Sequence, residues 1–144
     1  MRRTAPDPAR REWLVHSLHE TARKVPAGEP RARILHRVAR LYESLGLEWD
    51  AIAPLEGSVF EAVDSPRFLD RAERLMALQA RFGLWPDHQR VGALRLGRLQ
   101  ALGLGDEGAI ERRVELLTQL GRAALDELGD AVGARLYLEE ATRL

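Results

Sequence analysis

Apolar residues recur at three- and four-residue steps along most of this chain, a spacing that places them on one face of an α-helix. The pattern is clearest between residues 31 and 65. There, one stripe consists of Leu35, Val38, Ala39, Tyr42 and Leu45, and a second consists of Ala51, Leu55 and Ser58. Gly46 separates them and is suited to closing a helix with a positive φ. The pattern predicts two helices that bury their apolar faces against each other.

The order of residue types in this hairpin resembles the tetratricopeptide repeat (TPR). That family has a large apolar residue, an apolar–small pair and an aromatic on its first helix, then a turn, and small and bulky residues on its second. The matching residues are Leu35, Val38, Ala39 and Tyr42, then Gly46, then Ala51, Leu55 and Ser58. The resemblance implies an all-α fold, a right-handed stack of antiparallel helical hairpins that serves protein–protein contact.

Proline and glycine clusters divide the remaining chain into further helices. We expect about seven helices in a single TPR-like domain spanning residues 1–144. A capping helix is expected at residues 8–25, followed by hairpins at 31–65, 66–103 and 107–144. The segments LGRLQALGLGD from Leu96 and LGRAALDELGD from Leu120 echo each other, but positions 96 and 120 are too close for two full TPR copies of about 34 residues. The residues that still look TPR-like in the last hairpin are Leu120, Gly121, Leu128, Gly129, Asp130, Ala134, Leu138 and Ala141.

Some helix boundaries follow from local chemistry. Ser65 and Pro66 predict a helix start by side-chain capping, as Asp87 does for the helix ending near Leu102. Pro54 predicts a kink or a late helix start, because an internal proline costs roughly 3 kcal/mol. The residues expected to face inward are Trp13 or Leu14, Leu18, Ala22 and Val25 in the first helix, Phe68, Leu69, Ala72, Leu75, Met76 and Phe82 in the fourth, Val91, Leu94, Leu99 and Leu102 in the fifth, and Ile110, Val114, Leu117, Gly121, Ala124 and Leu128 in the sixth.

Composition narrows the class of protein without naming an activity. With 45% hydrophobic and 31% charged residues, the chain is typical of a globular domain. It contains no cysteine, which excludes disulfides and thiolate metal sites. We found neither a secretory signal nor an apolar run long enough to span a bilayer, so we expect a cytoplasmic protein. Lys24 is the only lysine among 22 basic residues, which indicates a GC-rich genome.

Motifs for catalysis and for cofactors are weak. Residues 103–108 match the dinucleotide pattern G-x-G-x-x-G, but a helix rather than a strand is expected before them. His16, His19 and Glu20 lie on one side of a helix without a second ligand cluster, and His36 and His88 would join them only if the fold brings them close. We therefore predict no catalytic residue, no metal and no cofactor.

Charge is more informative, although the net charge is zero. Residues 1–40 carry +6, 41–66 carry −6, 67–100 carry +4 and 101–144 carry −4. Arg33, His36 and Arg40 share one face of the hairpin's first helix, and Arg37 lies nearby. In TPR proteins this helix lines the groove, so the resemblance implies a basic groove for an acidic protein segment. The alternative interpretation of alternating blocks is that they attract one another on solvated helix faces.

Two hypotheses of function remain. The first is a non-catalytic interaction module or scaffold subunit that binds a protein partner through a groove or an end face. It includes self-association through the C-terminal helix, because Val132, Leu136, Tyr137 and Leu144 cannot all face inward and no polar closing helix follows them. The alternative is a regulatory or sensor domain that binds a small ligand or nucleic acid. Nucleic acid is the weaker partner, since the pI is about 6.9 and no aromatic platforms accompany the arginines.

Overall fold

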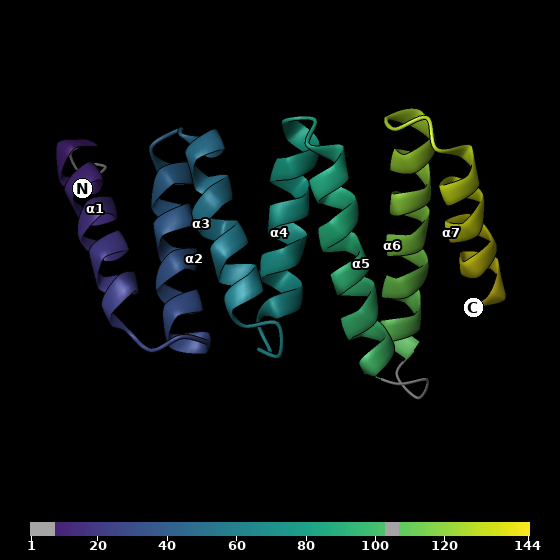
Figure 1. The fold of residues 1–144 in the computed structure, drawn as a ribbon, viewed down its shortest axis with the longest axis horizontal. Helices are drawn as coiled ribbons and strands as arrows, with labels where there is room; N and C mark the ends of the chain where they lie inside the picture. The colour runs from purple at the N-terminus through teal and green to yellow at the C-terminus, as the bar shows by residue number, and fades with distance from the viewer. Residues whose placement is uncertain (1–7, 103–106) are drawn as a thin grey trace, which may run out of the picture. The chain divides into compact units, whose positions relative to one another are not determined.

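A computed structural model of the chain describes residues 8–102 and 107–144, apart from the side chains of Pro8, Arg11 and Glu107. The described residues form seven α-helices and no strand, which confirms the all-α prediction (Figure 1). The helices are α1 (Pro8–Lys24), α2 (Glu29–Ser44), α3 (Glu48–Glu61), α4 (Phe68–Arg81), α5 (Trp85–Ala101), α6 (Glu107–Asp126) and α7 (Ala131–Arg143). They belong to two compact units, residues 1–78 and residues 79–144, and the division falls within α4.

In the first unit, α2 packs against both α3 and α1. The turn between α2 and α3 is built as the sequence predicts, because Gly46 has a φ of 76°. The N–H of Leu47 donates to the carbonyl of Tyr42 and that of Gly46 to Glu43, so the two bonds close α2 in a Schellman motif. Gly57 brings α3 close to α2, since a Cβ there would lie 3.1 Å from Cδ1 of Leu35.

The core of the first unit contains most of the hairpin stripe. Five of its members are fully buried, namely Val38, Ala39, Ala51, Leu55 and Ser58. Leu35, Tyr42 and Leu45 are half-buried. From α4, the predicted inward residues Phe68, Ala72, Leu75 and Met76 are at most 1% exposed. The two predicted helices therefore do bury their apolar faces by pairing, as the spacing indicates.

Arg31 ties α1 to the hairpin at the segment between Lys24 and Glu29. Its Nε donates to the carbonyl of Ala22 and its Nη2 to the carbonyl of Val25, both at 3.0 Å. These carbonyls lie at the C-terminal end of α1, where backbone acceptors lack helical partners and attract a cation. Glu61 of α3 stabilises the same segment, because its Oε1 accepts hydrogen bonds from the backbone N–H of Gly28 and from Arg31.

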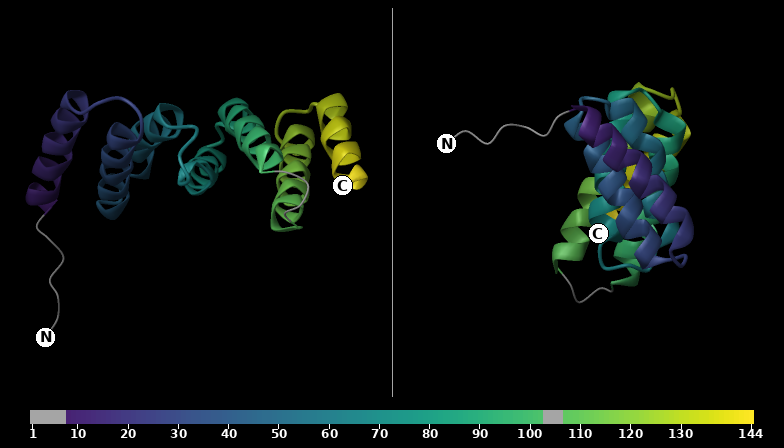
Figure 2. Two further views of the ribbon diagram at one scale, coloured as in Figure 1. Left: turned by 90° about the horizontal axis from the view of Figure 1, so that it is seen from below. Right: turned by 90° about the vertical axis from the view of Figure 1, so that its left-hand side faces the viewer.

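In the second unit, α6 packs against α5 and α7, and Figure 2 shows α6 and α7 side by side. Glycines make both contacts close. A Cβ on Gly92 of α5 would overlap the side chain of Leu120, and one on Gly121 would lie 3.0 Å from Cγ of Leu138. Asp130 caps α7, since its side chain accepts the N–H of Gly133 at 2.9 Å. The core includes Val91, Leu99, Leu116, Leu117 and Ala124.

Two predicted helix starts are wrong, and one alternative for a third helix is excluded. Helix α3 begins at Glu48 with Pro54 buried inside it, so of the two alternatives, a kink or a late start, the late start does not occur. Helix α4 begins at Phe68 rather than Pro66, because the hydroxyl of Ser65 accepts the N–H of Arg67 within a turn that precedes the helix. Helix α5 begins at Trp85 behind an N-cap at Leu84, which places Asp87 inside the first turn, paired with Arg90.

Several residues predicted to face inward are exposed. Of the two alternatives in α1, Trp13 is 66% exposed and Leu14 is half-buried, and Val15 (4%) joins Ala22 in the core. Of the other errors, three lie just past a helix end and one, Leu94, lies within α5. They are Phe82, Leu94, Leu102 and Leu128, each at least 37% exposed. The predicted turn at Gly103–Asp106 lies outside the described residues.

No helix in the described ranges is both long and apolar enough to cross a membrane. The stacking of hairpins into a right-handed TPR-like solenoid stays a prediction.

Candidate partner-binding face

One stripe of α2 carries charged and titratable residues along its whole length. Its members follow each other at steps of three or four residues, and so share a helix face: Glu29, Arg33, His36, Arg40 and Glu43. The helix starts at Glu29 with Pro30 in its first turn, where the missing N–H of proline has no cost. The stripe is therefore fixed by the helix register. We call it the α2 stripe.

Both ends of the α2 stripe are paired with arginines of α4 in the same unit. Arg71 donates two hydrogen bonds of 2.9 Å to the carboxylate of Glu29, and the side chain of Arg71 is only 2% exposed. Arg74 pairs with Glu43 at the other end, where its own side chain is 50% exposed. The bonds from Arg71, with help from the Ser65 hydroxyl, lower the pKa of Glu29 to about 2. Both acids of the stripe are thus neutralised by α4.

The centre of the α2 stripe carries arginines that are not ion-paired among the described residues. Arg33 and Arg40 are exposed, and Arg37 is exposed beside them. Within residues 8–102 and 107–144, none of these three guanidinium groups forms an ion pair. Arg67, in the turn directly before α4, adds a further exposed cation close enough to act on His36.

His36 differs from its arginine neighbours because it is half-buried. Burial lowers its pKa below 6.5, and the nearby charges of Arg71 and Arg40 lower the pKa further. At neutral pH the imidazole is therefore uncharged. The positive charge of this face comes from the arginines, and His36 offers a neutral donor or acceptor among them.

The structure brings the four predicted residues to one helix, with Arg33, His36 and Arg40 on the stripe and Arg37 at its edge. Sequence reasoning missed the contribution of α4. Arg71 and Arg74 lie three residues apart and share a face of α4, and Arg67 lies four residues before Arg71 in the turn that leads into the helix. That spacing was readable, but only the fold shows that the face lies against α2.

The other candidates from the sequence do not gather into a site. His19 packs its ring against Tyr42 of α2, with centroids 6.1 Å apart, and His16 is exposed. Burial lowers the pKa of His19, as do Arg23 and His16. Nowhere in the described part of the chain do three or more possible ligands among histidines and acids form a metal-binding group. Most of the G-x-G-x-x-G segment lies outside the described residues.

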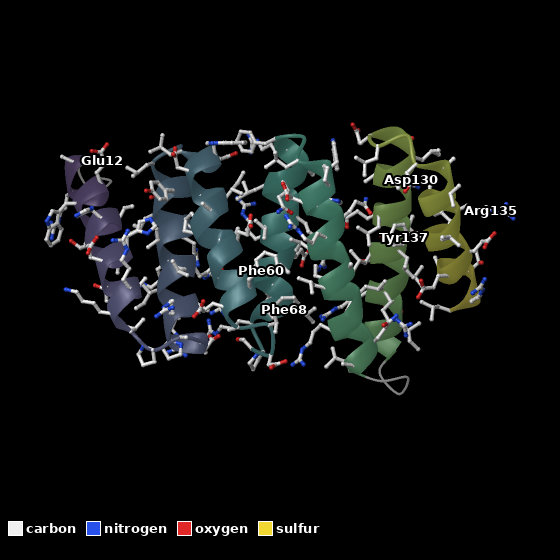
Figure 3. The ribbon with its side chains drawn as sticks, viewed as in Figure 1. Glu12, Phe60, Phe68, Asp130, Arg135 and Tyr137 are labelled. Atoms are coloured by element: carbon white, nitrogen blue, oxygen red, sulfur yellow. The ribbon has the colours of Figure 1, made fainter. Side chains whose placement is uncertain are left out.

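The C-terminal helix exposes apolar side chains. Val132 and Leu136, one turn apart, are 72% and 62% exposed, and Leu144 is 41% exposed. Tyr137 is half-buried. Arg135 extends from the outer side of α7, where it pairs with Glu139 (Figure 3). These residues do not all face inward, as the sequence indicates. Self-association through this helix stays a prediction.

Comparison with known proteins gave no relative: no protein-family model, no curated protein and no solved structure matches the chain.

Proposed function

We propose that this protein is a non-catalytic interaction module, built as a TPR-like stack of hairpins, that binds an acidic segment of a partner protein along the α2 stripe. The observation that carries the proposal is the arrangement of charge on this face. The stripe's own acids are held by Arg71 and Arg74, whereas Arg33 and Arg40 between them form no ion pair with any acid that the structure describes. A face organised in this way attracts carboxylates from outside the chain.

The exposed groups also suit a peptide carboxylate chemically. A guanidinium presents a planar fork that binds a carboxylate through two hydrogen bonds. Several such groups along one helix can bind successive Asp or Glu side chains of a peptide. The neutral imidazole of His36 adds a hydrogen-bonding group that does not repel or require charge. The ion pairs from α4 support a groove, because they hold a second helix beside the α2 stripe.

A protein partner is favoured over nucleic acid by the overall electrostatics. The chain has no net charge and a pI of about 6.9, so the long-range attraction to a polyanion is weak. The ring of Tyr42, the aromatic side chain of α2, is occupied by His19 rather than presented as a platform for bases.

The test is a titration of fluorescein-labelled peptides and oligonucleotides, followed by fluorescence anisotropy. We expect a Glu-rich peptide to bind, a Gln-for-Glu version not to bind, and the double variant Arg33→Glu/Arg40→Glu to lose binding. Reversing two contacting charges should weaken the complex by at least about tenfold. The matched control Arg112→Glu/Arg143→Glu makes the same change in net charge on exposed residues of the second unit, and should bind like the unmodified protein.

Two results would contradict the proposal. Equal losses in both double variants would mean that the peptide responds to net charge and not to the α2 stripe. Tighter binding of a single-stranded oligonucleotide than of the Glu-rich peptide would favour the nucleic-acid alternative. The small-ligand form of the alternative is favoured by a separate observation in the second unit, which concerns a different set of residues.

A further inference from the structure

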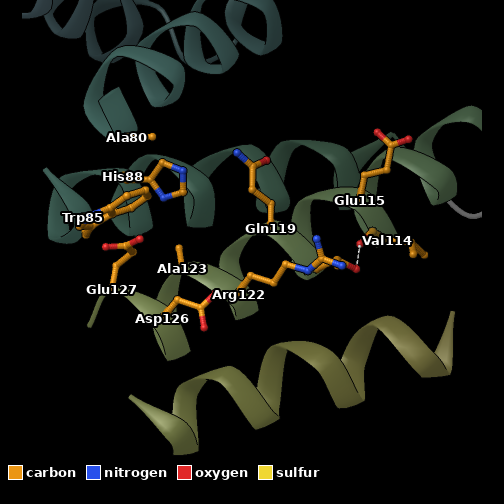
Figure 4. Close-up of a pocket in the computed structure, with 11 residues that line it drawn as sticks. Ala80, Trp85, His88, Val114, Glu115, Gln119, Arg122, Ala123, Asp126 and Glu127 are labelled. Atoms are coloured by element: carbon orange, nitrogen blue, oxygen red, sulfur yellow. Dashed lines mark hydrogen bonds between the residues drawn. The ribbon is translucent and has the colours of Figure 1, made fainter. Parts of the chain in front are cut away.

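The second unit contains a pocket between the last turn of α4, the start of α5 and one face of α6 (Figure 4). Its volume is about 520 Å³, which falls in the range of small-molecule sites. Trp85 and His88 from α5 lie on one side of it, and Ala123 of α6 lies opposite with Asp126 and Glu127 beside it. This end of the pocket is therefore shaped by an aromatic pair, a small apolar residue and two acids.

His88 is the unusual member of this set. It is 1% exposed, and neither ring nitrogen has a hydrogen-bond partner among the described residues. The imidazole lies edge-on to Trp85, with ring centroids 5.1 Å apart and an interplanar angle of 72°. Burial lowers its pKa, and the charge of Arg95 lowers the pKa further, so the ring is neutral. Native proteins pair nearly all buried polar atoms, so an unpaired imidazole is an exception that marks this part of the pocket wall.

Charge around the pocket is strongly unbalanced. Three carboxylates line it, from Glu115, Asp126 and Glu127, against the single guanidinium of Arg122. In the part of the chain that the structure describes, no ion pair engages any of these four groups. Asp126 and Glu127 lie at the same end as Trp85, whereas Glu115 lies at the far end (Figure 4). A cation at the first end would meet two carboxylates and an aromatic ring.

We propose that this pocket binds a small organic cation, with its ammonium group between Trp85, Asp126 and Glu127 and its apolar body over Ala123 and His88. Carboxylates and an indole both attract a desolvated ammonium, the indole through its π face. The ring of His88 gives the apolar body a flat surface, and the exposed side chain of Gln119 lies on the same rim of the pocket (Figure 4).

This pocket is independent of the α2 stripe, since every residue that lines it belongs to the second unit. Phenethylamine serves as the probe because it combines an ammonium with an aromatic body. Its charge-reversed analogue, 3-phenylpropionate, has a similar size and shape. Trp13 and Trp49 are exposed, so Trp13→Phe/Trp49→Phe leaves Trp85 as the one tryptophan and its fluorescence reports on the pocket.

We expect saturable quenching or enhancement of Trp85 fluorescence by phenethylamine and none by 3-phenylpropionate. Asp126→Asn/Glu127→Gln should weaken binding by roughly tenfold, within the range of a cation–π contact strengthened by charge. The control Glu111→Gln/Glu140→Gln removes the same charge from α6 and α7 outside this pocket, and should bind normally. Ala123→Leu, which fills the pocket, should abolish binding, and far-UV circular dichroism checks that the variant is folded.

The signals of His88 give a second readout by NMR. Its ring proton and nitrogen shifts should move on titration with phenethylamine, because the body of the ligand lies against the imidazole. The proposal is overturned by an equal response to the two probes, by a response that Ala123→Leu leaves intact in a folded variant, or by no saturable response to phenethylamine.

Discussion

The two units hold their helices together by different means. In the first unit, arginines join helices that are far apart in sequence: Arg31 reaches α1 and Glu61, Arg71 reaches Glu29, and Arg74 reaches Glu43. In the second unit, two close helix contacts are made across glycines, and ion pairs such as Arg90–Asp87 and Arg135–Glu139 join neighbours on one helix. The first unit also has one close glycine contact, at Gly57, but it should respond more strongly to pH and charge than the second unit does.

The largest effect should come from breaking the buried ion pair. Glu29→Gln leaves the guanidinium of Arg71, which is 2% exposed, without a counter-charge. It also removes an acid from the first turn of α2, where the helix dipole favours one. We expect a loss of about 2 kcal/mol in the free energy of unfolding, below the usual range for buried pairs because water reaches the partly exposed Glu29. Urea unfolding followed by circular dichroism measures it.

The matched control for this variant is Glu43→Gln, which breaks the other ion pair between α2 and α4. Since Arg74 is 50% exposed, its guanidinium regains water, and the loss should stay below about 1 kcal/mol. If the two variants lose equal stability, the burial of Arg71 is not what makes its ion pair important.

Lowering the pH should remove the stability that the ionised Glu29 contributes. The pKa of Glu29 falls from 4.5 to about 2 on folding, chiefly through its hydrogen bonds with Arg71. A carboxyl with a lowered pKa stabilises the fold above pH 4.5, and this contribution is lost as the pH falls from 4.5 towards 2. We therefore expect the stability difference between the unmodified protein and Glu29→Gln to be constant above pH 4.5 and to shrink below it.

The measurement is urea unfolding of both proteins at a series of pH values, with the difference taken at each one. Taking the difference cancels the titration of the other carboxyls that the two proteins share. A difference that does not change across this window would mean that Glu29 is not held in its charged form by Arg71.

Local pattern was enough to predict the parts of the fold that depend on neighbours in sequence. The hairpin of α2 and α3 follows from a stripe within one helix and a glycine beside it, so Val38, Ala39 and Gly46 could be assigned correctly. The α1 face could not, because Trp13 and Val15 are both apolar and only the packing against α2 selects between them.

The candidate sites divide in the same way. Arg33, His36 and Arg40 share a face by helical spacing alone, and were predicted. Arg71 lies 42 residues from Glu29, so nothing local shows that it neutralises that acid. The pocket around His88 depends on side chains from α4, α5 and α6 meeting, and the histidine was considered only as a possible metal ligand.

The smallest expected effect comes from replacing glycines of α5 by alanine. The two replacements distinguish the cost of added side-chain volume from the gain in helix propensity. Gly92 is buried in α5 against Leu120, and a Cβ there would overlap that side chain and lie 3.1 Å from its Cδ1. Gly92→Ala should lose about 1 kcal/mol, because the overpacking exceeds the gain in helix propensity. Gly97, on the same helix, has no atom within 4 Å of an added Cβ, so Gly97→Ala should gain up to about 1 kcal/mol. Urea unfolding of the two variants gives opposite signs if glycine is retained at position 92 for close packing. A gain in both would mean that Leu120 moves aside without cost, and that α5 and α6 do not need the close approach.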